Sequence, residues 1–403
     1  MSKRQNAPST ALIHHAYQAP AGFQSVVPGI HKASTVIFKD TKALRARQWK
    51  DKTGYTYGLH GTPSTFTLEE RLATLEGGVQ TLLAPSGLAA IALVDMALLR
   101  AGDEVLIPDN AYGPNKDLAR GELAQWGITH QFYDPMRPDE LARLITPKTK
   151  LIWLEAAGSV TLEFPDLIGL LHVARQHPDV IVALDNTWGA GLAFDAFAFD
   201  TTDGQARGVD ISIHALTKYP SGGADVLMGS ITTRDEAMHI RLKMAHMRMG
   251  LGVGGNDVEA ILRGLPTLPL RYAAHDAATR QIARWWQTRP EVSQVLHPAL
   301  PESPGHAYWA QVCSSAAGLV SVIFDERHSA DQVDAFIDAL TLFKIGYSWG
   351  GPVSLAVPYH LPSMRQGPEV PKGTLVRLAI GLEDPDDLIA DLAQGLARSM
   401  GGA

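Results

Sequence analysis

Two side chains capable of cofactor chemistry, Asp185 and Lys218, each follow an apolar segment with the composition of a buried strand. Asp185 comes directly after residues 180–184, and Lys218 follows residues 210–214 and precedes the glycine-rich turn 220–223. The carboxyl ends of parallel strands share one edge of an open α/β sheet, where ligands bind. A desolvated lysine there can form a Schiff base, and a carboxylate there can keep a ring nitrogen protonated. Taken singly, they could also be a surface lysine and a helix-capping acid.

A candidate phosphate site is formed by Ser86, Gly87 and Leu88, between an expected strand at 80–84 and an expected helix at 88–99. The free backbone N–H groups and the dipole at the N-terminus of a helix favour a phosphate group. Ser86 alone would be better explained as an ordinary helix cap. The segment therefore indicates a phosphate site only in combination with the other candidate residues.

Tyr112 lies just beyond an expected strand at 104–108, where its ring could lie flat on a planar ligand. Alone it would be better explained by packing. Together, the four signals describe a phosphate cradle, a stacking ring, a carboxylate for a pyridine nitrogen and a Schiff-base lysine. Pyridoxal 5'-phosphate requires this set of groups, because its protonated ring accepts electrons from a substrate carbanion.

The order of expected elements predicts an α/β fold whose large sheet is mostly parallel and covered on both faces. Strands alternate with helical segments, and a continuous apolar run suits a strand buried on both sides. The expected strands of this sheet are 80–84, 104–108, 130–133, 151–155, 180–184, 210–214 and 226–232, and the clearest intervening helix is 167–176.

The pattern changes after residue 255, which predicts a second, smaller α/β domain. Its expected elements are a helix at 257–287 interrupted by Pro266 and Pro269, strands at 318–324 and 374–380, and helices at 330–340 and 385–400. We therefore divide the chain into an N-terminal arm (1–62), a large cofactor-binding domain (63–256) and a C-terminal domain (257–403).

Composition excludes several classes of protein. Of the 403 residues, 45% are hydrophobic and 19% charged, and the net charge is −7 without a block of like charges, so neither nucleic acid nor a membrane is expected as a partner. The single cysteine, Cys313, fits a reducing compartment and a cytoplasmic location. The apolar stretch 82–99 is interrupted by Pro85 and Gly87, which favours a buried strand and helix over a membrane span. His14 and His15 lack a partner at ligand spacing, so no metal site is expected.

From Tyr57 to the C-terminal helix, the chain resembles the pyridoxal-phosphate-dependent family of cysteine and methionine metabolism, the trans-sulfuration enzymes. That family has the fold of aspartate aminotransferase, known as fold type I. The Tyr-Ser-Trp-Gly-Gly stretch points to the bacterial cystathionine β-lyase branch. The motifs that carry the resemblance are 75–78 (Leu-Glu-Gly-Gly), 185–188 (Asp-Asn-Thr-Trp), 217–219 (Thr-Lys-Tyr), 347–351 (Tyr-Ser-Trp-Gly-Gly) and 377–384, which begins with Arg377.

The resemblance implies a role for each cofactor residue. Lys218 would carry the cofactor as a Schiff base and then move protons, and Asp185 would pair with the pyridinium nitrogen. Tyr112 would stack on the ring. The residues implied to hold the phosphate are Ser86, Gly87, Leu88 and Thr217.

The resemblance also implies substrate and subunit contacts. Arg377 would bind the substrate α-carboxylate through two hydrogen bonds, and Ser348 and Trp349 would border the substrate. Tyr57 would reach the cofactor phosphate of a neighbouring subunit, so we expect a homo-oligomer, with a dimer of dimers favoured. The implied reaction converts cystathionine to homocysteine, pyruvate and ammonia in methionine biosynthesis.

The chain departs from the family pattern around the cofactor. Leu59 stands where the family has a phosphate-binding arginine, and His60 or Arg47 are the candidates to replace that arginine. Ala215 stands where many relatives have a phosphate-binding serine. Further departures are the altered turn 220–225, the segment 156–159 without its usual Ser/Thr-Pro step, and the absence of a substrate-side tyrosine around 246–247.

Three alternatives follow from these residues. A relative acting at Cγ, such as a γ-lyase, γ-synthase or sulfhydrylase, is disfavoured by the stretch 347–351. A regulator that binds the cofactor without turnover is suggested by Leu59 but disfavoured by the intact Lys218 and Asp185. A dinucleotide-binding enzyme would need its glycines after the first strand, whereas Gly77 and Gly78 precede it. The physiological thiol substrate and the choice between dimer and tetramer stay open.

Overall fold

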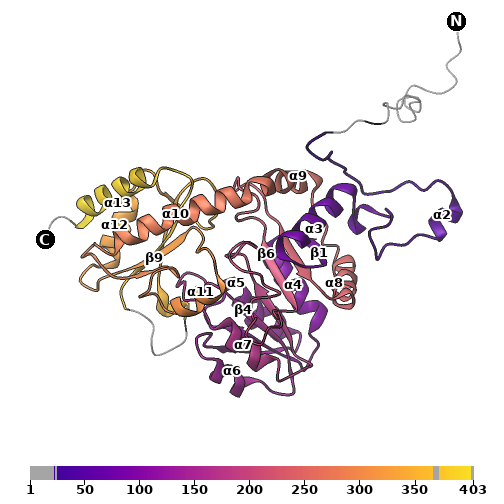
Figure 1. The fold of residues 1–403 in the computed structure, drawn as a ribbon, viewed down its shortest axis with the longest axis horizontal. Coiled ribbons are helices and arrows are strands. Elements are labelled where there is room, and N and C mark those ends of the chain that lie inside the picture. Colours follow the sequence, from indigo (N-terminus) through magenta and orange to yellow (C-terminus); the bar gives the residue numbers. More distant parts are fainter. Residues whose placement is uncertain (1–21, 23–24, 366–371, 401–403) are drawn as a thin grey trace, which may run out of the picture.

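The computed structural model describes residue 22 and residues 25–365 and 372–400, which form two sheets with helices around them (Figure 1). Within these residues the larger sheet has seven strands in the order β1-β7-β6-β5-β4-β2-β3. The strands are β1 (Gln80–Ala84), β2 (Glu104–Pro108), β3 (Thr129–Tyr133), β4 (Thr149–Glu155), β5 (Ile181–Asp185), β6 (Ile211–Ala215) and β7 (Gly229–Thr233).

Strand direction brings most carboxyl ends to one edge of the larger sheet. β3, β2, β4, β5 and β6 pair in parallel, whereas β7 pairs antiparallel with both β6 and β1. Because β1 and β6 flank the same antiparallel strand, they point the same way. The expected mostly parallel sheet is thus confirmed, and among the described strands of this larger sheet β7 alone runs in the opposite direction.

Both faces of the larger sheet are buried, which explains its continuous apolar runs. On one face, α4 (Gly87–Leu98) and α8 (Glu236–Met249) share an apolar cluster with inward side chains of β2 such as Val105 and Ile107. On the other face, α6 (Pro138–Leu144) and α7 (Leu167–Ala174) pack in the cluster that contains Leu106. Alternate residues of one strand therefore serve opposite layers.

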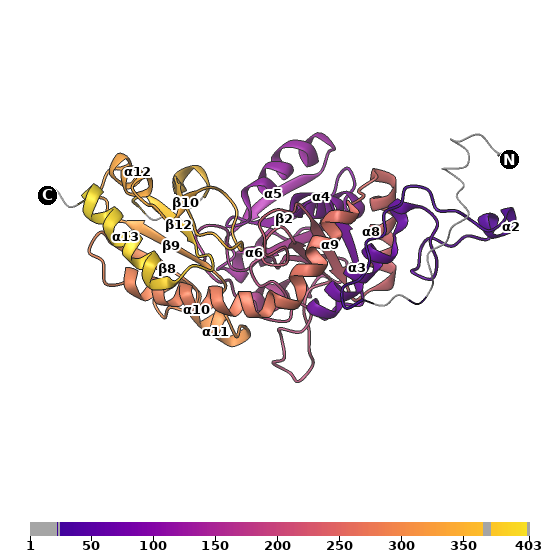
Figure 2. The ribbon, with the colours of Figure 1, turned by 90° about the horizontal axis from the view of Figure 1, so that it is seen from above.

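The smaller sheet has the order β10-β11-β12-β9-β8 within the described residues. Its strands are β8 (Val292–Leu296), β9 (Leu319–Phe324), β10 (Lys344–Ile345), β11 (Leu355–Tyr359) and β12 (Leu375–Ala379). A buried cluster joins this sheet to α10 (Leu268–Trp286), α12 (Ala330–Asp338) and α13 (Pro385–Met400). Figure 2 shows α10 running along one side from the larger body to the smaller one. The expected second α/β unit is present.

Prolines divide the expected helix at 257–287. It consists of α9 (Gly255–Gly264), the short turn η3 (Leu265–Thr267) that contains Pro266, and α10. α9 packs its Val258 and Ile261 in one cluster with Leu68 and Leu72 of α3 (Pro63–Glu76), on the side of the larger sheet. We keep the division 63–256 and 257–403 as a proposal, with α9 covering the larger domain.

The described part of the N-terminal arm has little regular structure. It contains α2 (Thr41–Arg45) and η1 (Gly58–His60), and the part around α2 extends away from the two sheets (Figure 1). A bridge pairs Thr35 with Tyr57, so the arm folds back on itself. His14 and His15 lie outside the described residues.

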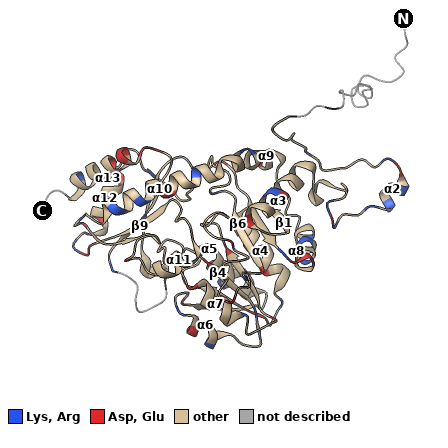
Figure 3. Cartoon of the chain, viewed as in Figure 1, with Lys and Arg blue, Asp and Glu red and all other residues tan. Residues whose placement is uncertain are grey.

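Charge, hydropathy and the placement of possible metal ligands each add one observation about the described part of the chain. Basic and acidic residues are interspersed over the elements (Figure 3). Among the helices of that part, none combines the length and apolar character that crossing a bilayer requires. In the same residues, no group of three or more His, Cys, Asp or Glu side chains is arranged to hold a metal ion.

Candidate active site

Lys218 lies in the loop that follows β6 and meets a segment of the smaller domain. Its Nζ atom donates a hydrogen bond to Ser348 Oγ at 2.7 Å and lies 5.3 Å from the centroid of the Trp349 ring. Burial, followed by the charge of Arg377, lowers the pKa of Lys218 to about 8, although Asp185 acts in the opposite direction. A lowered pKa gives a lysine the free amine that a nucleophile needs.

The segment that contains Ser348 can approach Lys218 because a glycine follows two residues later. Gly350 has a φ of 81°, and a Cβ atom there would lie 2.9 Å from the backbone nitrogen of Tyr219. A side chain at this position would therefore separate the two loops. The backbone of the smaller domain is thus held against the lysine loop of the larger one.

Asp185 is the last residue of β5, at the edge where the carboxyl ends of the parallel strands meet. Its Oδ1 atom accepts a hydrogen bond from the backbone N–H of Thr187 at 3.0 Å. Burial raises the pKa of Asp185, whereas Thr187, His214 and Lys218 lower it. A cationic ring nitrogen beside this carboxylate would offset the cost of burial and favour its ionised form.

Glu155, which the sequence analysis did not select, ends β4 and pairs in register with Asp185. It accepts a hydrogen bond from the backbone N–H of Tyr112 at 2.7 Å. Burial and the charge of Asp185 hold the pKa of Glu155 well above its usual range. Tyr112 is 42% exposed, and burial together with the charges of Asp185 and Glu155 raises the pKa of its phenol. Two carboxyl groups and an aromatic ring therefore share one end of the sheet.

The N-terminus of α4 forms the candidate phosphate cradle. Ser86 caps the helix by accepting a hydrogen bond from Ala89 N–H at 3.0 Å, whereas the N–H groups of Gly87 and Leu88 have no acceptor within the described residues. A Cβ atom on Gly87 would lie 2.6 Å from that of Ala215 at the end of β6. Glycine thus lets the cradle contact the strand that precedes Lys218, and two free donors remain for an anion.

Thr187 and Thr217 tie the loops of the site together. Thr187 Oγ1 accepts a hydrogen bond from the backbone N–H of Ala215 at 2.9 Å, which links the segment after Asp185 to the end of β6. Thr217 Oγ1 accepts a hydrogen bond from Met228 N–H at 3.2 Å and lies 3.4 Å from Met228 O. The Thr217 hydroxyl therefore connects the loop after β6 to the backbone of Met228, which directly precedes β7.

Arg377 of β12 is a buried guanidinium, 7% exposed, close to Lys218. It donates to the backbone oxygen of Ser348 at 3.3 Å and lies 5.3 Å from the centroid of the Tyr359 ring. Its Nε atom has no hydrogen-bond partner within the described residues. A buried donor without a partner suits a ligand carboxylate.

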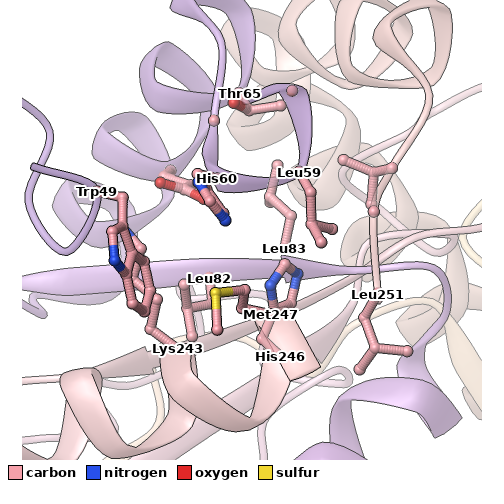
Figure 4. Close-up of a pocket in the computed structure, with 15 residues that line it drawn as sticks. Trp49, Leu59, His60, Thr65, Leu82, Leu83, Lys243, His246, Met247 and Leu251 are labelled. Atoms are coloured by element: carbon pink, nitrogen blue, oxygen red, sulfur yellow. The ribbon is translucent and has the colours of Figure 1, made fainter. Parts of the chain in front are cut away.

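Within the described residues, Tyr57 and Leu59 form no hydrogen bond, ion pair or ring contact with these groups. Tyr57 is 45% exposed, and its ring lies 5.9 Å from that of His60. Leu59 lines a pocket together with His60, Lys243 and His246 (Figure 4). A contact of Tyr57 with a neighbouring subunit stays a prediction.

Taken together, the residues suit pyridoxal phosphate and an amino acid. The two free N–H groups of the α4 cradle suit a phosphate, the Lys218 amine suits an aldehyde, and Asp185 suits a protonated ring nitrogen. Arg377, with its unpartnered Nε, suits the carboxylate of an amino acid.

Relatives of known identity match nearly the whole chain. The cystathionine β-lyase of Bordetella avium is 40% identical over 94% of this chain and 93% of its own length. That of Escherichia coli (strain K12) is 35% identical over 92% of this chain and 93% of its own. The structure of cystathionine γ-lyase from Lactobacillus plantarum, complexed with L-serine, superposes with a TM-score of 0.80 at 26% identity and covers 93% of both chains.

The family model described as Cys/Met metabolism PLP-dependent enzyme matches residues 9–397. This match spans both sheets and every residue of the candidate site. The cofactor implied by the site, pyridoxal phosphate, is the one that the family uses. From its sequence and its fold, this chain belongs to the Cys/Met metabolism PLP-dependent enzyme family.

Proposed function

We propose that the chain is a carbon–sulfur β-lyase that converts cystathionine and water to homocysteine, pyruvate and ammonia. The hydrogen bond between Lys218 and Ser348 is the observation that carries the proposal, because it brings the stretch 347–351 to the lysine. Relatives that carry the name cystathionine β-lyase support it independently.

Lys218 acts as the nucleophile and then as the proton carrier. When bound, pyridoxal phosphate supplies an aldehyde that captures amino groups and a ring that accepts electrons. With the substrate amino group held in the site, Lys218 Nζ would remove the proton from Cα, and the thiolate would leave from Cβ. Ser348 Oγ orients the amine before the reaction, and Lys218 is positioned to deliver its proton to the departing sulfur.

Three other side chains act by orientation and charge. Asp185 would keep the ring nitrogen of the cofactor protonated, and Tyr112 would cover the face of the ring. Arg377 fixes the substrate carboxylate, so that the Cα–H bond points at Lys218. The groups of the site come from both domains. The larger domain supplies the cradle at α4, and the smaller domain supplies both Arg377 and Ser348.

Arg377→Lys should raise the KM for cystathionine on the order of 10- to 100-fold, although the charge is kept. A guanidinium gives a carboxylate two parallel hydrogen bonds, whereas an ammonium is a point charge on a shorter side chain. Steady-state kinetics of the two proteins measures the effect, with Arg398→Lys on the last turn of α13 as the control. Equal KM and kcat values in Arg377→Lys and in the parent would remove Arg377 from the substrate site.

Capture of pyridoxal phosphate by the apoenzyme should accelerate with rising pH. The pKa of Lys218 is lowered to about 8, so its reactive free-base form grows as pH rises through that value. Between pH 7 and 9 the free fraction, and with it the rate constant, should increase roughly tenfold. Stopped-flow absorbance at fixed cofactor measures the rate. If the logarithm of the rate constant instead rose linearly with pH up to pH 10, as expected for an unperturbed lysine, the lowered pKa of Lys218 would be contradicted.

The thiol half of the substrate can be identified by a direct comparison. The enzyme is supplied separately with cystathionine, cystine and S-methylcysteine, and a thiol reagent follows the sulfur compound that is released. We expect the highest kcat/KM with cystathionine. A protein that releases sulfur from none of the three would not be a carbon–sulfur lyase.

We further propose a homo-oligomer, with a dimer of dimers favoured, and a cytoplasmic location. The N-terminal arm supports the oligomer, because several of its apolar side chains are exposed in the single chain: Val26, Ile30, Ile37, Leu44, Tyr55 and Tyr57. Exposed apolar surface of this kind marks an interaction site. Sedimentation equilibrium of the full chain distinguishes a monomer, which would contradict the proposal, from a dimer or tetramer.

A further inference from the structure

Arg365, which follows the short helix η4 (Leu361–Ser363) of the smaller domain, contacts buried side chains of the larger domain. Its Nε atom donates a hydrogen bond to Asp109 Oδ2 at 3.0 Å. Its Nη1 atom donates to Thr161 Oγ1 at 2.7 Å and to Glu163 Oε1 at 2.5 Å. Separating buried charges from their partner is costly, so these contacts hold the segment firmly in place. The lyase reaction proposed above uses none of these residues.

Asp109 also shapes the loop that carries Tyr112. It directly follows β2, and the buried Lys116 donates to Asp109 O at 2.7 Å and to Asp109 Oδ1 at 3.1 Å. Tyr112 lies between these two residues in the chain, so their contact closes the loop around the ring that we place on the cofactor. Lys116 also donates to Met364 O at 2.6 Å. The larger domain therefore binds both the backbone of Met364 and the side chain of Arg365.

Within the smaller domain, the same segment is attached to the neighbourhood of Arg377. Tyr359 ends β11, and the centroid of its ring lies 5.3 Å from the Arg377 guanidinium carbon. Leu361 is buried in an apolar cluster that includes a side chain of β12, and its backbone oxygen accepts a hydrogen bond from Arg365 N–H at 3.1 Å. The segment 359–365 therefore connects the guanidinium assigned to the substrate carboxylate with the end of β2.

We propose that Arg365 is a positioning residue, which fixes the carboxylate side of the site relative to its cofactor side. The proposal rests on the function proposed above, because Arg365 acts through Arg377. An amino acid must place its amine at the cofactor and its carboxylate at Arg377 simultaneously, so its affinity depends on the distance between the two sides. An amine without a carboxylate needs only the cofactor side. Misplacement by about 1 Å, even far from the reacting atoms, can cost up to about 10²-fold in rate.

Two small amines separate the two sides of the site in a binding experiment on the holoenzyme. Glycine has an amino group and a carboxylate but no group that can leave from Cβ, whereas ethanolamine has the amino group without the carboxylate. The change in absorbance of the bound cofactor gives the dissociation constant of each. Arg365→Met should weaken the binding of glycine on the order of 10-fold and leave that of ethanolamine unchanged.

Arg377→Lys distinguishes a failure of this proposal from a failure of the proposed function. Glycine binding does not depend on which bond the enzyme breaks, so a γ-acting enzyme would still report on Arg365. Arg377→Lys should also weaken glycine binding. If it does and Arg365→Met does not, only the role of Arg365 is overturned. If Arg377→Lys leaves glycine binding unchanged, the assignment of Arg377 and the role of Arg365 are overturned together.

Arg175→Met is the matched control for the loss of an ion pair. Arg175 also forms three hydrogen bonds within the described residues, but all of them lie in the larger domain. It donates to the two Asp210 carboxylate oxygens at 2.9 and 3.0 Å and to Gly208 O at 2.9 Å. The variant should bind both amines as the parent does, because no contact between the domains is lost.

The double variant Arg365→Met/Glu163→Gln keeps the test decisive if the single variant fails to fold. Glutamine removes the buried charge that Arg365→Met would leave without its arginine, and Asp109 keeps its contact with Lys116. The double variant should lose as much glycine affinity as the single one. Parent-like binding of glycine in either folded variant, or an equal weakening of glycine and ethanolamine, would overturn the proposal.

Discussion

Lys218→Ala should lower the turnover of cystathionine by at least about 10⁴-fold while leaving the fold intact. Alanine removes both the nucleophile and the proton carrier, and general acid–base catalysis alone contributes up to about 10⁴-fold. The hydrogen bond to Ser348 is also lost, but Ser348 lies in a partly exposed position where water can replace the ammonium. The phosphate cradle at α4 is untouched, so the variant should still bind the cofactor without a covalent bond.

Kinetics and peptide mapping together measure this result. Borohydride should attach the cofactor to the peptide that contains Lys218 in the parent and to no peptide in the variant. Lys148→Ala, at an exposed lysine of the same domain, is the matched control and should behave as the parent. A Lys218→Ala protein that retained more than about a tenth of the parent turnover would exclude Lys218 from the chemistry.

Asp185→Asn should lower kcat on the order of 10²- to 10³-fold, the size of effect seen when one preorganised electrostatic group is removed. Without a carboxylate, the ring nitrogen loses its proton more easily and the ring accepts electrons less well. Asparagine keeps an oxygen that can accept the hydrogen bond from Thr187 N–H, so the local structure should persist. The charge of Asp185 raises the pKa of Glu155, and its removal should let that pKa fall.

The kinetic loss should appear without a loss of stability. At pH 8 the apoenzyme of Asp185→Asn should unfold at the same temperature as the parent or above it, because one of two adjacent carboxylates has been neutralised. Asp179→Asn, at an exposed acid ahead of β5, is the control for both measurements. Near-parent kcat in Asp185→Asn would refute the assigned role, whatever its melting temperature.

The sequence was sufficient to predict the larger sheet and the residues at its edge. Continuous apolar runs identify strands buried on both faces, and the strand 104–108 was predicted with the bounds that the structure has. The helix 385–400 was also predicted with its observed bounds. Asp185 and Lys218 were found because polar residues after such runs must lie at one edge. The same rule would have found Glu155 at the end of β4.

Contacts between distant segments could not be predicted in this way. Lys218 and Ser348 are separated by 130 positions, and only the packing of the two domains makes them neighbours. β10 has two residues, too few for a pattern, and β8 was missed because its burial is interrupted. A role for Tyr57 depends on a second chain, about which a single sequence carries no geometric information.

The keto acid formed from cystathionine tests the central claim most directly. Purified holoenzyme is incubated with L-cystathionine, and the keto acid and thiol are identified by mass spectrometry, with Lys218→Ala as the blank. Cleavage at Cβ must give pyruvate and homocysteine in equal amounts, together with ammonia. Formation of 2-oxobutyrate and cysteine instead would show cleavage at Cγ and contradict the proposed β-lyase.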